Sequence, residues 1–331
     1  MPPHRGHQFL IEFARQYVER LTVMVCSLPR DPIPGHLRHA WVSRMFPDAR
    51  VVHVTDDLPQ EPADHPDFWD IWRDACRVAA PEGVDCVFAS ESYGLKLAEA
   101  LGARFVPVDC ARELVPVSGT AVRTDPMRQW EMIPECVRPY FVRRVCVFGP
   151  ESTGKSTLAR DLARQFDTVY AFEYARPLLD PQGGQCRPDD IPRIVRGQVA
   201  TEEALAYHAN RVLFCDTDVL TTCVWSDVLF GHTPEWVRDL ARRRDYHLYL
   251  VTDVDVPWVS DGQRFFSEQA QRRAMFDRFV RELTALGRPY QVVRGTWEQR
   301  LRDACDAVRA LLESPPGEPG TRVTGVNPRE R

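Results

Sequence analysis

The sequence predicts an α/β protein with two successive parallel sheets. Short apolar segments alternate with segments of helical periodicity in both halves of the 331-residue chain. That alternation is typical of βαβ units, in which helices connect parallel strands. The length corresponds to about two domains, because one domain usually holds about 100 to 200 residues. We therefore expect one parallel sheet in each half.

The predicted strands are short and rich in valine and other apolar residues. In the first half they are residues 21–26, 50–54, 86–88 and 105–108. The pattern restarts in the second half at residues 144–148, 169–172, 212–215, 247–251 and 290–293. A candidate helix separates each strand from the next, as parallel pairing requires.

A proline-containing connector separates the two predicted sheets. Residues 125–139 contain prolines at positions 126, 134 and 139, which allow at most short helical pieces. We place the first domain at 1–140 and the second at 141–313. Residues 314–331 are rich in proline and glycine without periodicity, and we expect this tail to be disordered.

The composition excludes several classes of protein. The net charge is −5, and the chain has no block of Lys and Arg, which argues against a nucleic-acid partner. The ten cysteines form no C-x-x-C pair, so neither a zinc site nor a redox dithiol is indicated. We find no signal segment and no run of 18 apolar residues. The expectation is a cytoplasmic protein without a membrane partner.

The most specific motif is a P-loop between a predicted strand and a predicted helix. Residues 149–157 satisfy G-x-x-x-x-G-K-[ST]. In such a loop backbone N–H groups bind phosphate oxygens, Lys155 reaches the β- and γ-phosphates, and the Ser156 hydroxyl ligates Mg²⁺. The predicted ATP contacts are Gly149, Glu151, Ser152, Thr153, Gly154, Lys155, Ser156 and Thr157.

Two carboxylates follow the predicted strand 212–215. A P-loop needs an acidic group at the end of a neighbouring strand to hold or orient the metal. We assign Asp216 to the metal, together with Ser156, and expect Asp218 to face the phosphate acceptor as a base candidate. The alternative for either carboxylate is that it only caps the following helix.

Glu173 and Arg176 follow the strand 169–172 at the same expected sheet edge, where ligands of open α/β sheets bind. Glu173 would accept the proton of a substrate hydroxyl or bind a ribose diol. Arg176 would contact a phosphate, with an ordinary salt bridge at a helix start as the alternative. Arg264 is the best candidate for a lid arginine over the transferred phosphoryl group. The alternative for its segment is a solvated surface loop.

The first half has a weaker pair of phosphate-binding signals. His4, Gly6 and His7 stand at the start of a predicted helix, where two imidazoles and backbone amides suit a triphosphate. Hydroxyls and a cation that could hold the departing pyrophosphate follow at Ser118, Thr120 and Arg123. As alternatives, Ser118 is only an N-cap and His4 lies on a disordered terminus.

The two halves together resemble the bifunctional, NadR-like family of nicotinamide-nucleotide adenylyltransferases and ribosylnicotinamide kinases. The matching segments are 2–7, 90–96, 117–123, 138–142, the P-loop, 173–176, 216–218 and 257–264. The resemblance implies a Rossmann-like nucleotidylyltransferase domain of the H-x-G-H class followed by a P-loop kinase domain. It implies that His4 and His7 are catalytic and that Ser118, Thr120 and Arg123 contact ATP. Trp258 lies in a matching segment and is assigned to the substrate.

The implied chemistry uses ATP and Mg²⁺ in two steps. The kinase half would phosphorylate nicotinamide riboside to nicotinamide mononucleotide. The other half would transfer the adenylyl group of ATP to that product, giving NAD and pyrophosphate. Two other functions stay open, a nucleotide-sensing regulatory protein and a P-loop kinase for another nucleoside. A homo-oligomer also stays open.

The sequence departs from the family pattern in two places. Some members carry an N-terminal helix-turn-helix, and nothing precedes Pro2 here that could form one, so we expect no DNA role of that type. The family's first strand and its glycine, which come just before the Pro-Pro-His segment, are also absent. We expect either a translation start further upstream or a weakened adenylyltransferase half.

Overall fold

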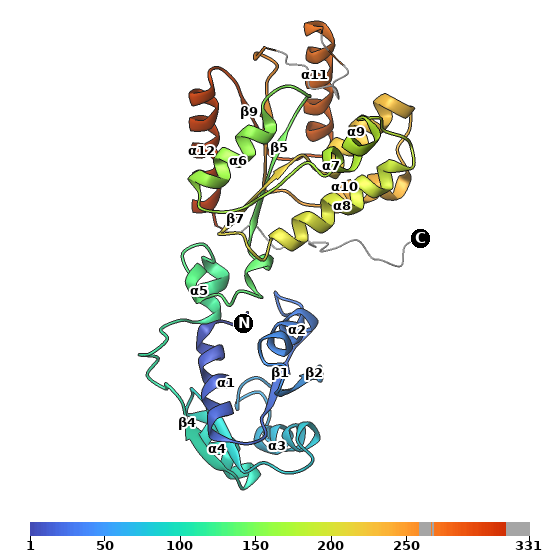
Figure 1. Ribbon diagram of the computed structural model, residues 1–331. Coiled ribbons are helices and arrows are strands. Elements are labelled where there is room, and N and C mark those ends of the chain that lie inside the picture. Colours follow the sequence, from blue (N-terminus) through green and yellow to red (C-terminus); the bar gives the residue numbers. More distant parts are fainter. Residues whose placement is uncertain (258–265, 267, 316–331) are drawn as a thin grey trace. The chain divides into compact units, whose positions relative to one another are not determined.

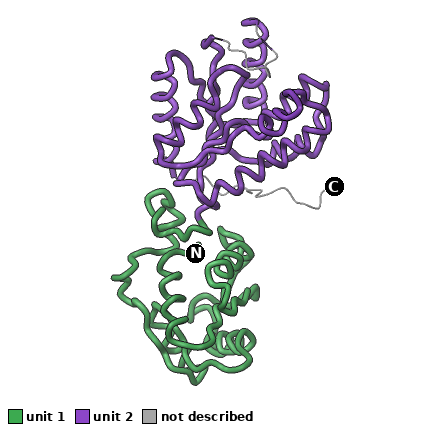
Figure 2. Tube along the Cα trace, in the orientation of Figure 1, with its two compact units in different colours: residues 1–137 green, residues 138–331 purple. Residues whose placement is uncertain are grey.

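The structure is a computed structural model that describes residues 1–257, 266 and 268–315 (Figure 1). The chain divides into two compact units, unit 1 from Met1 to Val137 and unit 2 from Arg138 to Arg331, coloured green and purple in Figure 2. Trp258, Arg264 and the tail 316–331 lie outside the described residues.

Unit 1 contains the predicted strands, each followed by a helix. Its elements are α1 Arg5–Tyr17, β1 Thr22–Cys26, α2 Gly35–Met45, β2 Arg50–Val54, α3 Phe68–Ala79, β3 Cys86–Ala89, α4 Tyr93–Leu101, β4 Arg104–Pro107, α5 Gly119–Thr124 and η1 Trp130–Met132. The expected parallel pairing is confirmed, with β1 beside β2 and β3 beside β4.

The strands of unit 1 form two separate pairs, where the sequence had predicted one sheet. Each pair is one βαβ unit, with α2 between β1 and β2 and α4 between β3 and β4. No strand in the described part of the chain bridges β1 and β3. A small core of Ile11, Val25, Val42 and Phe46 holds α1 and α2 to the first pair.

Unit 2 is built around one five-stranded parallel sheet in the order β6-β7-β5-β8-β9. Its strands are β5 Arg143–Phe148, β6 Tyr170–Ala171, β7 Val212–Asp216, β8 Leu248–Thr252 and β9 Tyr290–Val293. Its helices are η2 Arg138–Tyr140, α6 Lys155–Gln165, α7 Ala175–Leu179, η3 Asp180–Gln182, α8 Asp190–Leu205, α9 Val219–Phe230, α10 Glu235–Arg243, α11 Gln269–Ala285 and α12 Trp297–Glu313.

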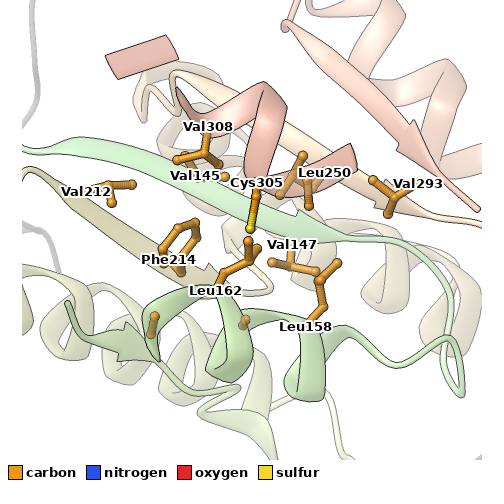
Figure 3. Close-up of a cluster of buried hydrophobic side chains, with 13 residues drawn as sticks. Val145, Val147, Leu158, Leu162, Val212, Phe214, Leu250, Val293, Cys305 and Val308 are labelled. Atoms are coloured by element: carbon orange, nitrogen blue, oxygen red, sulfur yellow. The ribbon is translucent and has the colours of Figure 1, made fainter. Parts of the chain in front are cut away.

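Helices cover both faces of this sheet. On one face Leu158 and Leu162 of α6 and Val308 of α12 pack against Val145 and Val147 of β5 (Figure 3). On the other face the ring of Phe148 meets the ring of Phe279 of α11 edge-on, with centroids 4.7 Å apart. Burial on both faces explains why β5 is almost continuously apolar.

A buried ionic cluster centred on Glu202 joins α8 to the sheet. Glu202 is 0% exposed and accepts hydrogen bonds from Arg244 at 2.8 Å, Tyr246 at 2.9 Å, Gln198 at 3.1 Å and Arg144 at 3.4 Å. A buried carboxylate is tolerated only when it is paired and hydrogen-bonded in this way. The cluster therefore holds α8 in one position relative to β5 and β8.

Gly197 of α8 lies directly against the ring of Tyr174, and a Cβ there would be 2.0 Å from Tyr174 Cε1. In an open helix Gly→Ala would stabilise by about 1 kcal/mol. Here we expect Gly197→Ala to lower the free energy of unfolding by roughly 1 to 3 kcal/mol, because the ring must move. Ala200→Gly, at an exposed position of the same helix, is the control, because it changes the free energy of unfolding through helix propensity alone. Denaturant titration measures both, and a stabilised Gly197→Ala protein would contradict the close packing.

Candidate active site

The loop between β5 and α6 has the backbone of an anion-binding loop. Gly149, Ser152 and Gly154 have positive φ angles of 132°, 59° and 85°. At Gly154 a Cβ would also lie 3.1 Å from the indole of Trp297, so any side chain there would be in tight contact with that ring. Helix α6 begins directly after it, at Lys155. The unpaired N–H groups of that first turn and the positive end of the helix dipole favour an anion at this place.

The side chains of the loop divide into an inner and an outer set. Thr153 is buried and donates to the Pro150 carbonyl at 2.8 Å, and its hydroxyl lies 2.6 Å from that of Thr252. Its side chain therefore braces the loop, and only its backbone is available to a phosphate. Lys155 Nζ donates to the same Pro150 carbonyl at 2.7 Å, so the ammonium lies over the loop.

Asp216 ends β7 beside the P-loop strand, in register with Val147. Asp216 is 1% exposed, and its Oδ1 has no hydrogen-bond partner among the described residues. Burial, and next the charge of Glu173, raise its pKa to about 6, against the opposing effects of Lys155 and Ser156. The structure thus brings together the two residues assigned to the metal.

The donor set around Asp216 fits Mg²⁺. Mg²⁺ is usually held by one or two protein oxygens together with phosphate and water oxygens. Ser156 and Asp216 offer a hydroxyl and a carboxylate oxygen with an unused lone pair. Among the described residues no group of three or more His, Cys, Asp or Glu could form a complete protein cage. The site therefore suits a cation that arrives with a nucleotide.

The structure does not support the prediction that Asp218 faces an acceptor. Its Oδ1 accepts from the backbone N–H and the hydroxyl of Thr221, at 2.8 and 2.9 Å, and caps α9. Its Oδ2 accepts from the Tyr249 hydroxyl at 2.9 Å. Both oxygens are occupied and the side chain is buried, so the alternative interpretation as a helix cap describes its position.

A pocket with a polar end and an apolar wall lies beside the P-loop. Its polar end contains Lys155, Glu151, Glu173 and Arg176. Glu173 accepts a hydrogen bond from Arg176 Nε at 2.9 Å, so the salt bridge named as the alternative for Arg176 is present, and it lies at the pocket itself. The apolar wall comes from α7, α8 and α9 and consists of Leu179, Ile191, Ile194, Trp225 and Leu229.

Two residues of this region, Trp225 and Gln198, were missed by the sequence analysis. Trp225 lines the pocket and stacks on Phe266, with centroids 6.0 Å apart and planes at 16°. Gln198 accepts from the Tyr174 N–H at 3.1 Å and donates to the Thr217 carbonyl at 3.4 Å, which links the turns after β6 and β7. The spacing of Thr221, Trp225 and Leu229 on one face of α9 was the available signal for the wall.

In unit 1 the two histidines stand at the start of α1 with their ring centroids 3.9 Å apart. Burial lowers the pKa of His4 to about 3, aided by His7, and lowers the pKa of His7 to about 4. Both imidazoles are therefore neutral at pH 7. Gly6 lies between them in sequence, and a Cβ at Gly6 would be 3.5 Å from Val117. The fold thus brings the two distant motifs together.

The second motif forms the short helix α5. Ser118 is its N-cap and accepts from the Ala121 N–H at 3.1 Å, as the alternative interpretation proposed. Arg123 donates to the Thr120 hydroxyl at 3.1 Å and to the Met1 carbonyl. Ser118, Thr120 and Arg123 therefore already have protein partners, which a nucleotide would have to share or replace.

Comparison with known proteins places these features in a family. The family model described as an AAA domain matches residues 144–300. The chain is 30% identical to the trifunctional NAD biosynthesis/regulator protein NadR of Escherichia coli over 296 residues, 82% of this chain and 71% of that protein. The NadR protein of Salmonella typhimurium is 30% identical over 306 residues, covering 85% and 74% of the two chains.

Solved structures agree on the fold. A crystal structure of NadR protein in complex with NR has a TM-score of 0.75 and 22% identity, covering 95% of this chain and 94% of that one. A NadR structure in complex with NAD and AMP-PNP has the same TM-score and identity, with 94% and 93% coverage. These similarities confirm the predicted α/β fold class. Within the described ranges no helix is long and apolar enough to cross a bilayer.

The neutral histidines make the stability of unit 1 depend on pH. Below the ordinary histidine pKa of 6.5 the unfolded chain takes up protons that the folded unit does not, so stability falls as the pH falls toward about 4. We expect each histidine to cost roughly 1 to 2 kcal/mol between pH 7 and pH 5. His7→Gln should flatten this dependence, and His36→Gln, at an exposed position, should not. Urea titrations at each pH measure the slopes, and equal slopes in the two variants would contradict the assignment.

Proposed function

The chain belongs to the NadR family of NAD biosynthesis proteins, and from this premise we propose that unit 2 transfers the γ-phosphoryl group of ATP to the 5′-hydroxyl of nicotinamide riboside. One observation carries the proposal. The P-loop, the buried Asp216 and a pocket with Glu173 at its polar end meet at the carboxyl edge of one sheet. That arrangement suits a nucleoside acceptor placed in line with the terminal phosphate of a bound nucleotide.

The pocket walls match the two parts of a nucleoside. Trp225 and the leucines and isoleucines beside it offer an apolar, aromatic surface for a planar base. Glu173 and Arg176, which also line the pocket, suit the ribose hydroxyls and the incoming phosphate. Trp258 and Arg264, which lie outside the described residues, stay predictions as further contacts to the substrate and to the phosphate.

In the proposed kinase reaction the chain positions the reactants and stabilises charge. Glu173 accepts the proton of the 5′-hydroxyl as that oxygen forms a bond to the γ-phosphorus and the bond to the β-phosphate oxygen breaks. Lys155 exchanges the Pro150 carbonyl for phosphate oxygens, and Arg176 stabilises charge on the transferred group. Ser156 and Asp216 would hold Mg²⁺, which neutralises phosphate charge when bound. The leaving group is ADP.

We assign adenylyl transfer to unit 1. His4, Gly6 and His7 would contact the phosphates of ATP, and Ser118, Thr120 and Arg123 would hold the departing pyrophosphate. The phosphate of nicotinamide mononucleotide attacks the α-phosphorus of ATP, and the bond to the pyrophosphate oxygen breaks, which gives NAD. The low pKa values of His4 and His7 mean that the imidazoles act there as neutral hydrogen-bond donors.

Incubation of the chain with ATP, Mg²⁺ and nicotinamide riboside tests both assignments, because the products differ. We expect nicotinamide mononucleotide with ADP first, and NAD with pyrophosphate after it. Mononucleotide without NAD would reject the unit 1 assignment alone. Phosphorylation of another nucleoside in preference to nicotinamide riboside would reject the acceptor and retain the kinase.

Lys155→Ala should lower kcat of riboside phosphorylation on the order of 100-fold or more, because it removes a preorganised charge at the transferred phosphate. Adenylyl transfer from added nicotinamide mononucleotide should be unchanged. Arg160→Ala, at an exposed position of the same helix, serves as the control and should leave both rates at wild-type values. Loss of both activities in a folded Lys155→Ala protein would contradict separate sites.

Glu173→Gln should lower kcat for riboside phosphorylation by roughly 100-fold or more, because the amide cannot accept the hydroxyl proton. The affinity for ATP should stay near that of the wild type, since Glu173 lies on the acceptor side. Steady-state kinetics beside a calorimetric ATP titration separate the two effects. Wild-type turnover would return Glu173 to the role of a salt-bridge partner for Arg176.

A further inference from the structure

A buried arginine joins helix α12 to the P-loop. Arg300 is 0% exposed and donates to the carbonyls of Thr153 at 3.0 Å, Asp253 at 3.1 Å and Gly295 at 3.2 Å. It also pairs with the carboxylate of Asp255. A buried charge is costly unless such partners surround it, so this guanidinium is held in one place. Its partners come from three segments that meet behind the P-loop.

The bond to Thr153 has a consequence for the next residue. The Thr153 carbonyl and the Gly154 N–H belong to one planar peptide group and point in opposite directions. Because Arg300 holds the carbonyl on its own side, the Gly154 N–H is turned to the other side, where α6 begins. A second buried guanidinium, that of Arg272, donates to the Ser152 carbonyl at 3.4 Å. It therefore holds the carbonyl of the Ser152–Thr153 peptide, as Arg300 holds the carbonyl of the Thr153–Gly154 peptide.

Trp297 supports the same peptide from the same turn of α12. Its indole packs against the α-carbon side of Gly154, where a Cβ would approach to 3.1 Å. The first turn of α12 is itself secured by a capping box between Thr296 and Gln299. The sequence around Arg300 therefore forms a rigid base for the loop.

We propose that Arg300 is a positioning residue for nucleotide binding, which orients the Gly154 N–H toward the phosphates by holding the Thr153 carbonyl. The inference rests on the proposed ATP site of unit 2 and not on the identity of the acceptor. An arginine suits this task better than a lysine, because its planar fork has five donors and reaches several carbonyls at once.

The test is a calorimetric titration of the full chain with Mg·ADP. We expect Arg300→Met to weaken binding about 10- to 100-fold, the range for loss of a charge-assisted hydrogen bond. Arg300→Lys should show a smaller loss. Asp255→Asn breaks the ion pair but leaves the bond to Thr153, so its affinity should stay near wild type. Arg309→Met, on the exposed side of the same helix, is the matched control.

Thermal unfolding of each variant separates positioning from general stability. Ala200→Gly, at an exposed position of α8, lowers helix stability without touching α12, and should lower the unfolding temperature while the folded protein binds Mg·ADP normally. If Arg300→Met does not fold, Arg300→Lys is judged by the same criterion. Wild-type affinity in a destabilised Arg300→Met protein would overturn the proposal, as would an equal loss in Asp255→Asn. If the wild-type chain binds Mg·ADP but does not phosphorylate nicotinamide riboside, the proposed acceptor is wrong. The role of Arg300 in nucleotide binding can still be tested in that case.

Discussion

The parallel pairing of β5 with β7 on one side and β8 on the other is the constraint on which the site of unit 2 depends. Parallel strands end at the same edge, so the P-loop after β5, Asp216 at the end of β7 and the turn with Glu173 after β6 must converge. The carboxylate that suits the metal is in register with Val147 of the P-loop strand. The site is therefore a product of sheet order more than of any one loop.

Buried charge is the second requirement of this site. Arg300 orders the back of the P-loop, while Glu202 anchors Gln198, whose amide links the turns that follow β6 and β7. Both groups are fully buried, and each has several hydrogen-bond partners. Burying such charges has a large desolvation cost, and breaking one of their hydrogen bonds leaves an unpaired buried group. The clusters therefore keep the side chains around the site in fixed positions, in surroundings of low dielectric constant. Burial in the same low-dielectric surroundings is the main cause of the raised pKa of Asp216, which faces the proposed metal.

The sequence predicted the strands and the P-loop well because these signals are local. The strands 50–54 and 290–293 have the predicted limits. Gly149 and Gly154 of the loop have positive φ angles, and helix α6 begins at Lys155, as the P-loop motif predicts. Asp218 was assigned to the acceptor, and the cap role could not be chosen from the sequence because the direction of the side chain depends on the Tyr249 hydroxyl of a later strand. Trp225, Gln198 and the division of unit 1 into two strand pairs likewise depend on tertiary packing.

The two proposed nucleotide sites solve the problem of binding phosphate in different ways. Unit 2 uses a glycine loop, a lysine and a buried carboxylate on the edge of a continuous sheet, with arginines that brace the loop from behind. Unit 1 uses the starts of α1 and α5, where buried histidines are neutral and contribute dipoles without charge. After burial and the Met1 ammonium, the charge of Arg112 also lowers the pKa of both histidines, and Arg123 in α5 adds a further positive charge to unit 1.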